Sequence, residues 1–441
     1  MKSRMWTCTT VMISLVALMV AVRLAAQDSE AHSQQAAYSV VSLATLGGTS
    51  GIANTINNRN WAMGAANLAG NQTVNATVWL EGLTFDLGTL GGPNSGIEWP
   101  VKNNRGVIAG IAETGTANPL GEAWSCSAFF PTVTGDICLG FKWQNGVMTA
   151  LPTLGGYDGY AAGVNDRGEI VGWAENTVHD STCVAPQVLQ FEAVIWGSNN
   201  QVQELPPFSG DVDGAATAIN DQGQVVGISG VCDVAVGAFS AAHALLWQNG
   251  VPTNLGSLGG VAWNTPAAIN ALGEVVGFSD LPGDQNGAPN FHAFLWTAQT
   301  GMQDLGTLQG DVYSEALDIN EQGQVVGTSC TANFASCRAF IWQNGVMTDL
   351  NTIIPPNSPL YLLDANGINN RGEIAGQAYE QSTGDTPPFR AIPTPGAGEA
   401  RLPQAQRGAQ TPRAAMPENV RQMILRRLGL DRSPAAPTRP Q

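Results

Sequence analysis

The chain has 441 residues and a formal net charge of −16 at pH 7, and only 12% of its residues are charged, about half the usual share. The acidic balance disfavours nucleic acid and anionic membranes as partners, and it favours cations, neutral glycans or basic partners. With 52 Gly and only three Lys, the composition is typical of many short strands joined by tight turns.

The N-terminus has the pattern of an export signal. Lys2 and Arg4 precede an apolar run over 11–22, and small residues follow Arg23. We predict a signal peptide over 1–26 and a short linker over 27–37, so the protein is secreted or periplasmic. The run of about twelve residues is shorter than the roughly 20 that span a bilayer. The alternative is an uncleaved anchor. We expect no transmembrane span after the signal is removed.

A repeat unit begins seven times with an Asn and continues, three residues later, with a Gly. The first copy has Asn60 in place of that Gly, and Asn is the residue that best tolerates a left-handed backbone after Gly. We interpret Asn-x-x-Gly as a tight turn between two strands, in preference to a ligand or calcium site. The seven anchors are Asn57, Asn103, Asn165, Asn220, Asn270, Asn320 and Asn369.

Two further strands complete the unit. One ends in a Trp and leads in several copies to an Asn-Gly hairpin, and the last resembles "DLGTLGG" (86–92). We expect the Trp to pack between units, with sugar stacking as the alternative. Six of the twelve Trp take this position: Trp79, Trp143, Trp196, Trp247, Trp296 and Trp342.

Four strands in every 46–62 residues predict an all-β, seven-bladed β-propeller over 38–394. The last unit has its first three strands but no good fourth, and the orphan segment "YSVVSLATLGG" (38–48) matches the missing one. We therefore expect the N-terminal strand to complete the last antiparallel blade and close the ring, which removes exposed sheet edges. An open β-solenoid is the alternative.

Cysteine usage agrees with export. Six Cys follow the predicted signal, with no C-x-x-C pair, and an even number in an exported chain favours disulfides over a metal site. Proximity suggests Cys126–Cys138 and Cys330–Cys337, which leaves Cys183–Cys232. Fifteen pairings exist for six cysteines, so the spacing does not settle this one.

We expect the variable loops to lie on one face of the ring, opposite the Asn-x-x-Gly turns, and binding residues to concentrate there. The loops between second and third strands span 111–138, 173–191, 228–242, 278–291, 328–337 and 377–388. They carry Glu113, Glu122, Trp124, Glu175, Asp180, Asp233, Asp280 and Asp284.

Asp211 and Asp213 alternate in a linker, as calcium ligands can, so calcium is the one cofactor we predict; a solvated loop is the alternative. His243 and His292 take matching positions, and we expect them to form structural hydrogen bonds rather than a metal site. No zinc-protease, nucleophile-elbow or phosphate-loop motif is present.

The tail over 395–441 reverses the charge, because its last 46 residues hold eight Arg and three acidic residues. It is rich in Pro, Ala and Gln, which predicts disorder. Within it, 417–430 is compatible with a short basic amphipathic helix. That helix either rests on the acidic ring or docks on a surface partner.

The chain resembles the bacterial extracellular HAF-repeat proteins over about residues 38–394, through "HAFLW" (292–296) and "HALLW" (243–247). The resemblance implies export and a repeat domain, and no established activity. We predict a monomeric, secreted binding or scaffold module whose loop face takes an extracellular glycan or protein. The alternative is a polysaccharide hydrolase or lyase that uses loop carboxylates, and we favour a protein that is not an enzyme.

Overall fold

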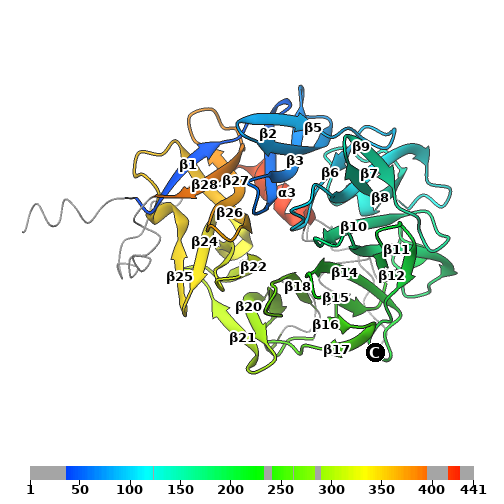
Figure 1. The fold of residues 1–441 in the computed structure, drawn as a ribbon. Coiled ribbons are helices and arrows are strands. Elements are labelled where there is room, and N and C mark those ends of the chain that lie inside the picture. Colours follow the sequence, from blue (N-terminus) through cyan, green and yellow to red (C-terminus); the bar gives the residue numbers. More distant parts are fainter. Residues whose placement is uncertain are drawn as a thin grey trace, which may run out of the picture.

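The computed structural model describes residues 36–122, 124–232, 241–261, 263–283, 290–394 and 416–427. The predicted signal peptide and most of the tail lie outside these residues. The described chain forms seven four-stranded antiparallel sheets arranged in a ring, which confirms the predicted seven-bladed propeller (Figure 1). None of its helices is long and apolar enough to cross a bilayer.

Each of the first six blades is one unit of consecutive strands, running from the centre of the ring to the rim. Blade one contains β2 (Gly47–Ile56), β3 (Ala62–Leu68), β4 (Val74–Leu80) and β5 (Leu83–Asp86). Blade two contains β6 (Ser95–Gly96), β7 (Ile108–Ala117), β8 (Asp136–Gln144) and β9 (Val147–Ala150). Blade three contains β10 (Gly159–Val164), β11 (Ile170–His179), β12 (Leu189–Trp196) and β13 (Val202–Glu204). Blade four contains β14 (Asp213–Ile219), β15 (Val225–Gly230), β16 (His243–Gln248) and β17 (Val251–Asn254). Blade five contains β18 (Asn264–Ile269), β19 (Val275–Asp280), β20 (Phe291–Thr297) and β21 (Gly301–Gly306). Blade six contains β22 (Tyr313–Ile319), β23 (Val325–Cys330), β24 (Cys337–Gln343) and β25 (Val346–Asp349).

The seventh blade joins the two ends of the propeller. It contains β26 (Leu360–Ile368), β27 (Ile374–Glu380) and β28 (Pro388–Pro393), with β1 (Tyr38–Ser42) as its outermost strand. Val40 pairs with Ala391 across β1 and β28. The N-terminal strand therefore closes the ring, as the split repeat predicted. The short helices are α2 (Trp124–Ser127), η2 (Ala332–Phe334), η3 (Leu350–Thr352) and α3 (Glu418–Arg427).

The Asn-x-x-Gly segments are the turns between the two inner strands of each blade. The third residue after each anchor has a positive φ, from +66° at Asn60 to +85° at Gly106. Each anchor's Oδ1 accepts hydrogen bonds from the backbone amides two and four residues on, at 2.8–3.1 Å. The predicted turn is confirmed. We call the surface that carries these turns the turn face, and the opposite surface the loop face.

The same seven Asn side chains also link the blades to one another. Each Nδ2 donates to the backbone carbonyl of the next anchor, from Asn57 to Asn103 and onward until Asn369 donates back to Asn57. The seven N···O distances are 2.6–3.2 Å, and the anchors are 1–6% exposed. We call this closed circle the asparagine ring. It uses both ends of one buried amide, one for the turn and one for the neighbouring blade.

A glycine recurs in the second strand of every blade because the innermost strand approaches it closely. A Cβ at Gly227 of β15 would collide with the Ala215 carbonyl oxygen. The inner strand of that blade shifts register between Ala216 and Ala218, and a bulge of this kind presses its backbone against the neighbouring strand. The other six glycines meet the inner strand in the same way: Gly64, Gly110, Gly172, Gly277, Gly327 and Gly376.

The repeated Trp residues pack between blades. Trp196 and Trp247 are 1% exposed, and Trp247 Nε1 donates to the Pro206 carbonyl of the linker that precedes its blade at 2.7 Å. Trp79 and Trp196 make equivalent bonds to Ala44 and Pro152. These three side chains are core residues with no ring face open to a sugar, whereas Trp143, Trp296 and Trp342 are partly buried and pack against the hydrophobic clusters between blades.

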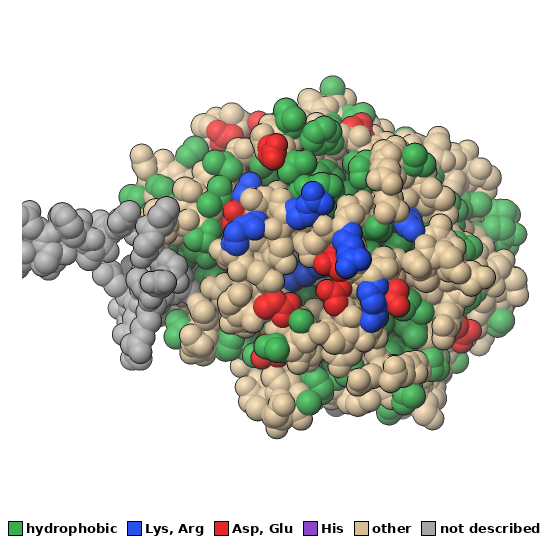
Figure 2. Space-filling model, in the orientation of Figure 1, with side chains coloured by type: hydrophobic (Ala, Val, Ile, Leu, Met, Phe, Trp, Pro, Cys, Tyr) green, Lys and Arg blue, Asp and Glu red, His purple; other side chains and the backbone are tan. Residues whose placement is uncertain are grey.

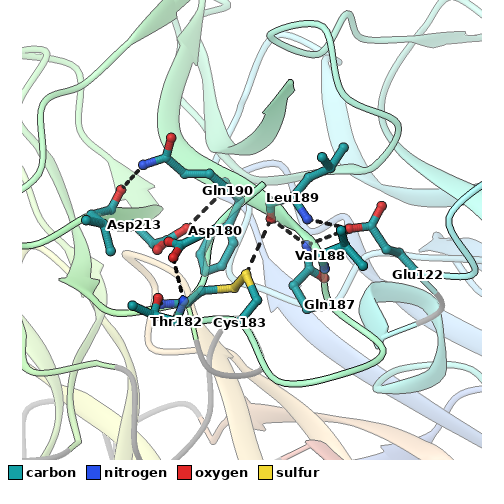
Figure 3. Close-up of a disulfide and its surroundings, with 12 residues drawn as sticks. Glu122, Asp180, Thr182, Cys183, Gln187, Val188, Leu189, Gln190 and Asp213 are labelled. Atoms are coloured by element: carbon teal, nitrogen blue, oxygen red, sulfur yellow. Dashed lines mark hydrogen bonds between the residues drawn. A yellow bond between two sulfur atoms is a disulfide. The ribbon is translucent and has the colours of Figure 1, made fainter. Parts of the chain in front are cut away.

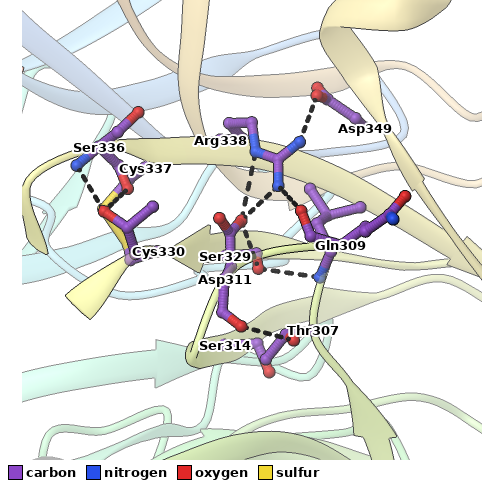
Figure 4. Close-up of polar contacts among 12 residues, drawn as sticks. Thr307, Gln309, Asp311, Ser314, Ser329, Cys330, Ser336, Cys337, Arg338 and Asp349 are labelled. Carbon is purple, nitrogen blue, oxygen red and sulfur yellow. Dashed lines mark hydrogen bonds and ion pairs between the residues drawn. A yellow bond between two sulfur atoms is a disulfide. The ribbon is translucent and has the colours of Figure 1, made fainter. Parts of the chain in front are cut away.

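The residue four positions before the Trp contacts a carboxylate in three blades. His243 Nδ1 lies 2.7 Å from Asp211, and His292 Nδ1 lies 2.9 Å from Asp304. In blade six the matching residue is Arg338, which contacts Asp311 at 2.7 Å and Asp349 at 3.1 Å (Figure 4). The two histidines therefore have the structural hydrogen bonds that the sequence suggested.

We predict that Asn220→Asp lowers the stability of the whole ring. The substitution keeps the acceptor that caps the turn but removes the amide that donates to Asn270. It also faces the Asn270 carbonyl with a carboxylate, so we expect a loss of about 3 kcal/mol at pH 7. The measurement is the midpoint of guanidinium unfolding. Asn249→Asp is the control, because it makes the same substitution at an exposed Asn of a hairpin turn. An Asn220→Asp midpoint equal to wild type would contradict the role of the asparagine ring.

We predict that Arg338→Met destabilises blade six by about 3–5 kcal/mol, because it leaves two buried carboxylates without their cation. Arg167→Met is the matched control. Its pair with Glu169 is 47% and 30% exposed, so its loss costs about 0–1 kcal/mol. Urea unfolding of both variants tests the difference. Equal losses would show that the buried network in Figure 4 does not carry the stability of this blade.

Candidate functional site

The turn face has a cavity at the centre of the ring. Its volume is about 320 Å³, and its wall combines the anchors with the residues that follow them. Three of these residues are acidic: Asp166, Asp221 and Glu321. Figure 2 shows basic and acidic side chains gathered around the centre of one face. Four described Arg lie in the turns of the turn face: Arg59, Arg105, Arg167 and Arg371.

One lysine crosses the central channel beneath this cavity. Lys102 of blade two forms an ion pair with Asp318 of blade six at 2.7 Å and donates to the Ile319 carbonyl. Burial raises the pKa of Asp318 although the Lys102 charge opposes the shift. The pair connects opposite sides of the ring, and Lys102 also lines the cavity.

The loop face is closed by a single hydrophobic cluster that draws on all seven blades. Its large members include Tyr160, Trp173, Trp263, Phe291 and Tyr361. The cluster also contains Met416 and Val420 of the tail, which are 9% and 2% exposed. In Figure 1 α3 lies near the centre of the ring, so the tail helix covers this end of the channel.

Two hydrogen bonds fix α3 against blade six. The Met416 amide donates to the Ala335 carbonyl at 3.2 Å, and Arg421 Nε donates to the Asn333 carbonyl at 2.8 Å. The sequence predicted a short helix over 417–430, and the described helix covers Glu418–Arg427. Of the two expectations for this helix, the structure has it resting on the ring.

The loop acids differ from the expectation of an open binding surface. Glu113, Glu122, Glu175 and Asp280 are fully buried, with 0% exposure each, and Asp180 is half-buried. Asp233 and Asp284, together with the Trp124 side chain, lie outside the described part of the structure. Only Glu122 and Asp180 lie in connections; Glu113, Glu175 and Asp280 lie in β7, β11 and β19, not in the loops where the sequence analysis placed them.

Three buried carboxylates meet between blades two and three. Glu122, Asp158 and Glu175 each offer an oxygen, and these atoms lie within 4.8 Å of one another. Burial and then the Glu175 charge raise the pKa of Asp158 to about 9. Burial, together with the negative charge of Glu122, raises the pKa of Glu175 to about 7. Asp158 was absent from the sequence-based candidates, because it precedes an inner strand and not a variable loop.

The predicted calcium ligands Asp211 and Asp213 have different partners. Asp211 Oδ2 accepts from Ser229 and contacts His243 within its own blade. Asp213 Oδ1 accepts from the Phe191 amide of the preceding blade at 3.0 Å. Burial and a hydrogen bond shared with Asp180 raise the pKa of Asp213 to about 9. The calcium site at these two residues stays a prediction.

The three predicted disulfides are confirmed, and they all lie on the loop face. Cys126–Cys138 closes the loop of blade two, and Cys330–Cys337 joins the ends of β23 and β24. Cys183–Cys232 joins the loops of blades three and four, at a Cα separation of 4.7 Å. In Figure 3 the segment around Cys183 lies between Glu122 on one side and Asp180 and Asp213 on the other.

We predict that the stability of the calcium-free protein falls as pH rises from about 5 to 9. The raised pKa values of Asp158, Glu175 and Asp213 mean that the folded state binds more protons than the unfolded state above pH 4. Each such carboxyl then lowers the free energy of unfolding as pH rises, until pH passes its folded pKa. Urea unfolding across this range measures the slope. Asp158→Asn makes the slope shallower; a slope unchanged by this variant would contradict the assignment.

No protein-family model matches the chain, and no curated protein is similar to it in sequence. Its solved structural neighbours include a streptogramin B lyase, with 11% identity over 81% of this chain and 98% of that one and a TM-score of 0.44. An oligogalacturonate lyase in complex with manganese has 10% identity over 83% and 98% of the two chains and a TM-score of 0.40. A puromycin hydrolase has 13% identity over 78% and 56%, with a TM-score of 0.44. Likenesses this distant carry no argument about the site or its function.

Proposed function

We propose that the protein is an exported binding or scaffold module that takes its ligand on the loop face. The observation that carries the proposal is the seat of α3. A segment separated from the propeller by residues 395–415 buries Val420 almost completely in the hydrophobic cluster of the seven blades. A surface that accommodates one amphipathic helix has the shape and chemistry to take another.

The seat of α3 favours a protein ligand over a glycan. Met416, Val420 and Ile424 give the helix an apolar face at spacings of four residues, and Leu425 also packs against the cluster. Arg421 adds a charged contact to blade six. The aromatic rings of the same cluster, such as Trp173 and Trp263, are 2% exposed with α3 in place. We infer a ligand that presents a short, basic, amphipathic helix, and α3 occupies its place within the same chain.

The acidic ring suits such a ligand. Residues 27–395 hold 32 acidic and eight basic side chains, whereas the last 46 residues hold eight Arg. Opposite charges increase the rate of association and orient the partners before apolar contact is made. The tail therefore reproduces, within the chain, the charge and hydrophobic pattern that we infer for the partner.

Export is the second part of the proposal. Three disulfides in one chain support an oxidising compartment. The predicted signal peptide over 1–26 and the resemblance to the extracellular HAF-repeat proteins agree with it. Both remain part of the proposal.

A polysaccharide hydrolase or lyase is the alternative function. Glu122, Asp158 and Glu175 lie within 4.8 Å of one another, near the roughly 5–5.5 Å between the carboxyls of retaining glycosidases. Their side chains are 0–2% exposed, so a polysaccharide does not reach them in this conformation. Activity on polysaccharides that is lost in Glu175→Gln would favour the enzyme over the binding module.

We predict that releasing α3 exposes a binding site for a helical peptide. In the full chain, Val420→Asp with Ile424→Asp places two charges against the hydrophobic cluster and displaces the helix. A fluorescein-labelled synthetic peptide of residues 414–428 then binds at least about tenfold more tightly than it binds the wild-type protein, because α3 no longer competes at high effective concentration. Fluorescence anisotropy measures the affinity.

Asn419→Asp is the control, since it adds a negative charge on the exposed side of α3. It leaves peptide affinity at the wild-type value. Circular dichroism and the melting temperature report whether each variant retains the propeller. A folded Val420→Asp, Ile424→Asp protein that binds the peptide no better than wild type would overturn the proposal.

A further inference from the structure

The buried carboxylates of Glu122, Asp158 and Glu175 come from three separate segments. Glu122 lies in the connection between β7 and β8, Asp158 directly precedes β10, and Glu175 lies in β11. All three are at most 2% exposed. Three acceptors of the same charge therefore meet between two blades, away from solvent.

Neutral donors hold the three side chains in place. Glu122 Oε1 accepts from the Val188 and Leu189 amides at 2.9 and 2.6 Å (Figure 3). Asp158 accepts from the Cys138 amide at 2.8 Å and from Asn118 Nδ2 at 3.0 Å. Glu175 accepts from the Asp158 amide and from Gln187 Nε2, both at 2.8 Å. These hydrogen bonds fix the positions of the three carboxyl groups.

No positive side chain balances these charges. The ion pairs formed within the described residues involve none of the three. Glu122 Oε2 is also buried without a hydrogen-bond partner there. Buried polar atoms are nearly always satisfied, and an orphaned carboxylate oxygen in a group of acids points to a missing ion.

The neighbouring repeat shows how the same position is satisfied without an ion. Asn94 precedes the inner strand of blade two, and Asp158 takes the same position before the inner strand of blade three. Each side chain accepts a hydrogen bond from a backbone amide near the start of the third strand of the preceding blade. Asn94 Nδ2 donates to Glu113 at 2.8 Å, and Thr134 donates to its other oxygen at 2.7 Å. In blade three the amide is replaced by a carboxylate, and Glu122 adds a second. Gln187 Nε2 now donates to Glu175, and two further carboxyl groups share the position that one amide takes in blade two.

We propose that Glu122, Asp158 and Glu175 form a binding site for a divalent cation, for which Ca²⁺ fits best. Oxygens bound to Ca²⁺ at about 2.3–2.6 Å lie up to roughly 5 Å apart across the ion, which matches a group within 4.8 Å. All three ligands are hard carboxylate oxygens, the donor set of calcium rather than of zinc or copper. The nearby Cys138 is in a disulfide.

The site would connect the loops of two blades. Glu122 belongs to the loop that Cys126–Cys138 closes, while Asp158 and Glu175 belong to blade three, whose loop Cys183–Cys232 fastens to blade four. Among the described residues, no disulfide crosses the interface between blades two and three. A cation at this site connects the loops across that interface. This inference does not rest on the function proposed above, because the cation acts on the fold whether or not α3 is displaced.

The experiment uses the full mature chain, freed of metal with a chelator and titrated with CaCl₂ at pH 8 by isothermal titration calorimetry and differential scanning fluorimetry. We expect one ion per chain, with a Kd of about 10⁻⁴ M or lower, and a melting temperature raised by about 3 °C at saturation. Glu122→Gln lowers the affinity at least tenfold. Glu113→Gln, the matched change in blade two, leaves it unchanged.

Asp158→Asn separates loss of the site from loss of the fold. This variant recreates the amide of blade two, so its calcium-free form melts at a higher temperature than calcium-free wild type at pH 8 and gains nothing from CaCl₂. A wild-type protein that neither binds nor is stabilised by 5 mM CaCl₂ would overturn the proposal, and the three carboxyls would then share protons instead. Retention of wild-type calcium affinity in Asp158→Asn would overturn it equally.

Discussion

The side-chain amide of one repeated asparagine stabilises both the single blade and the contact between neighbouring blades. Its oxygen closes the turn between the two inner strands of a blade, and its nitrogen donates to the corresponding turn of the next blade. Because both bonds are buried, neither a shorter side chain nor a carboxylate replaces them without leaving a polar group unsatisfied. The circle closes only if the last anchor, Asn369, reaches the first, Asn57, which it does at 3.2 Å. Seven blades are thus linked at the residue that also shapes each of them.

This constraint explains why the two faces of the ring differ. The turn face repeats the same short turn seven times, so its variation is confined to side chains around the central cavity, such as Asp221 and Ala271. Within the described residues, the connections on the loop face make no such ring bond, so their lengths are free to vary. The cluster beneath α3, the three disulfides and the buried carboxylates all lie there. The repeated turns therefore define the scaffold on the turn face, whereas the features that differ between blades lie on the loop face.

The sequence predicted the fold well because its signals are local and repeated. Asn60 in place of a Gly identified a positive φ, and the orphan strand at 38–48 identified the closure. The sites were predicted poorly because they depend on distant partners. The donor end of Asn220 meets Asn270, 50 residues away, and the turn interpretation used only the acceptor end. The cavity on the turn face was missed for the same reason, since Lys102 and Asp318 are 216 positions apart in the chain and only the closed ring joins them.

The burial of the acidic residues on the loop face could not be predicted from their positions in the sequence. Acidic residues in variable loops are ordinarily solvated, and the sequence offers no direct sign that Glu122 turns inward to the amides of Val188 and Leu189. A comparison of the repeats with one another does carry a signal. The "LGGPN" of blade two becomes "LGGYD" in blade three, and this change from Asn94 to Asp158 replaces the amide that donates to Glu113 with a carboxyl group. A comparison of one buried polar position between neighbouring blades is therefore better evidence of a specialised site than the number of acids in a loop, because the neighbouring blade shows a donor that satisfies that position.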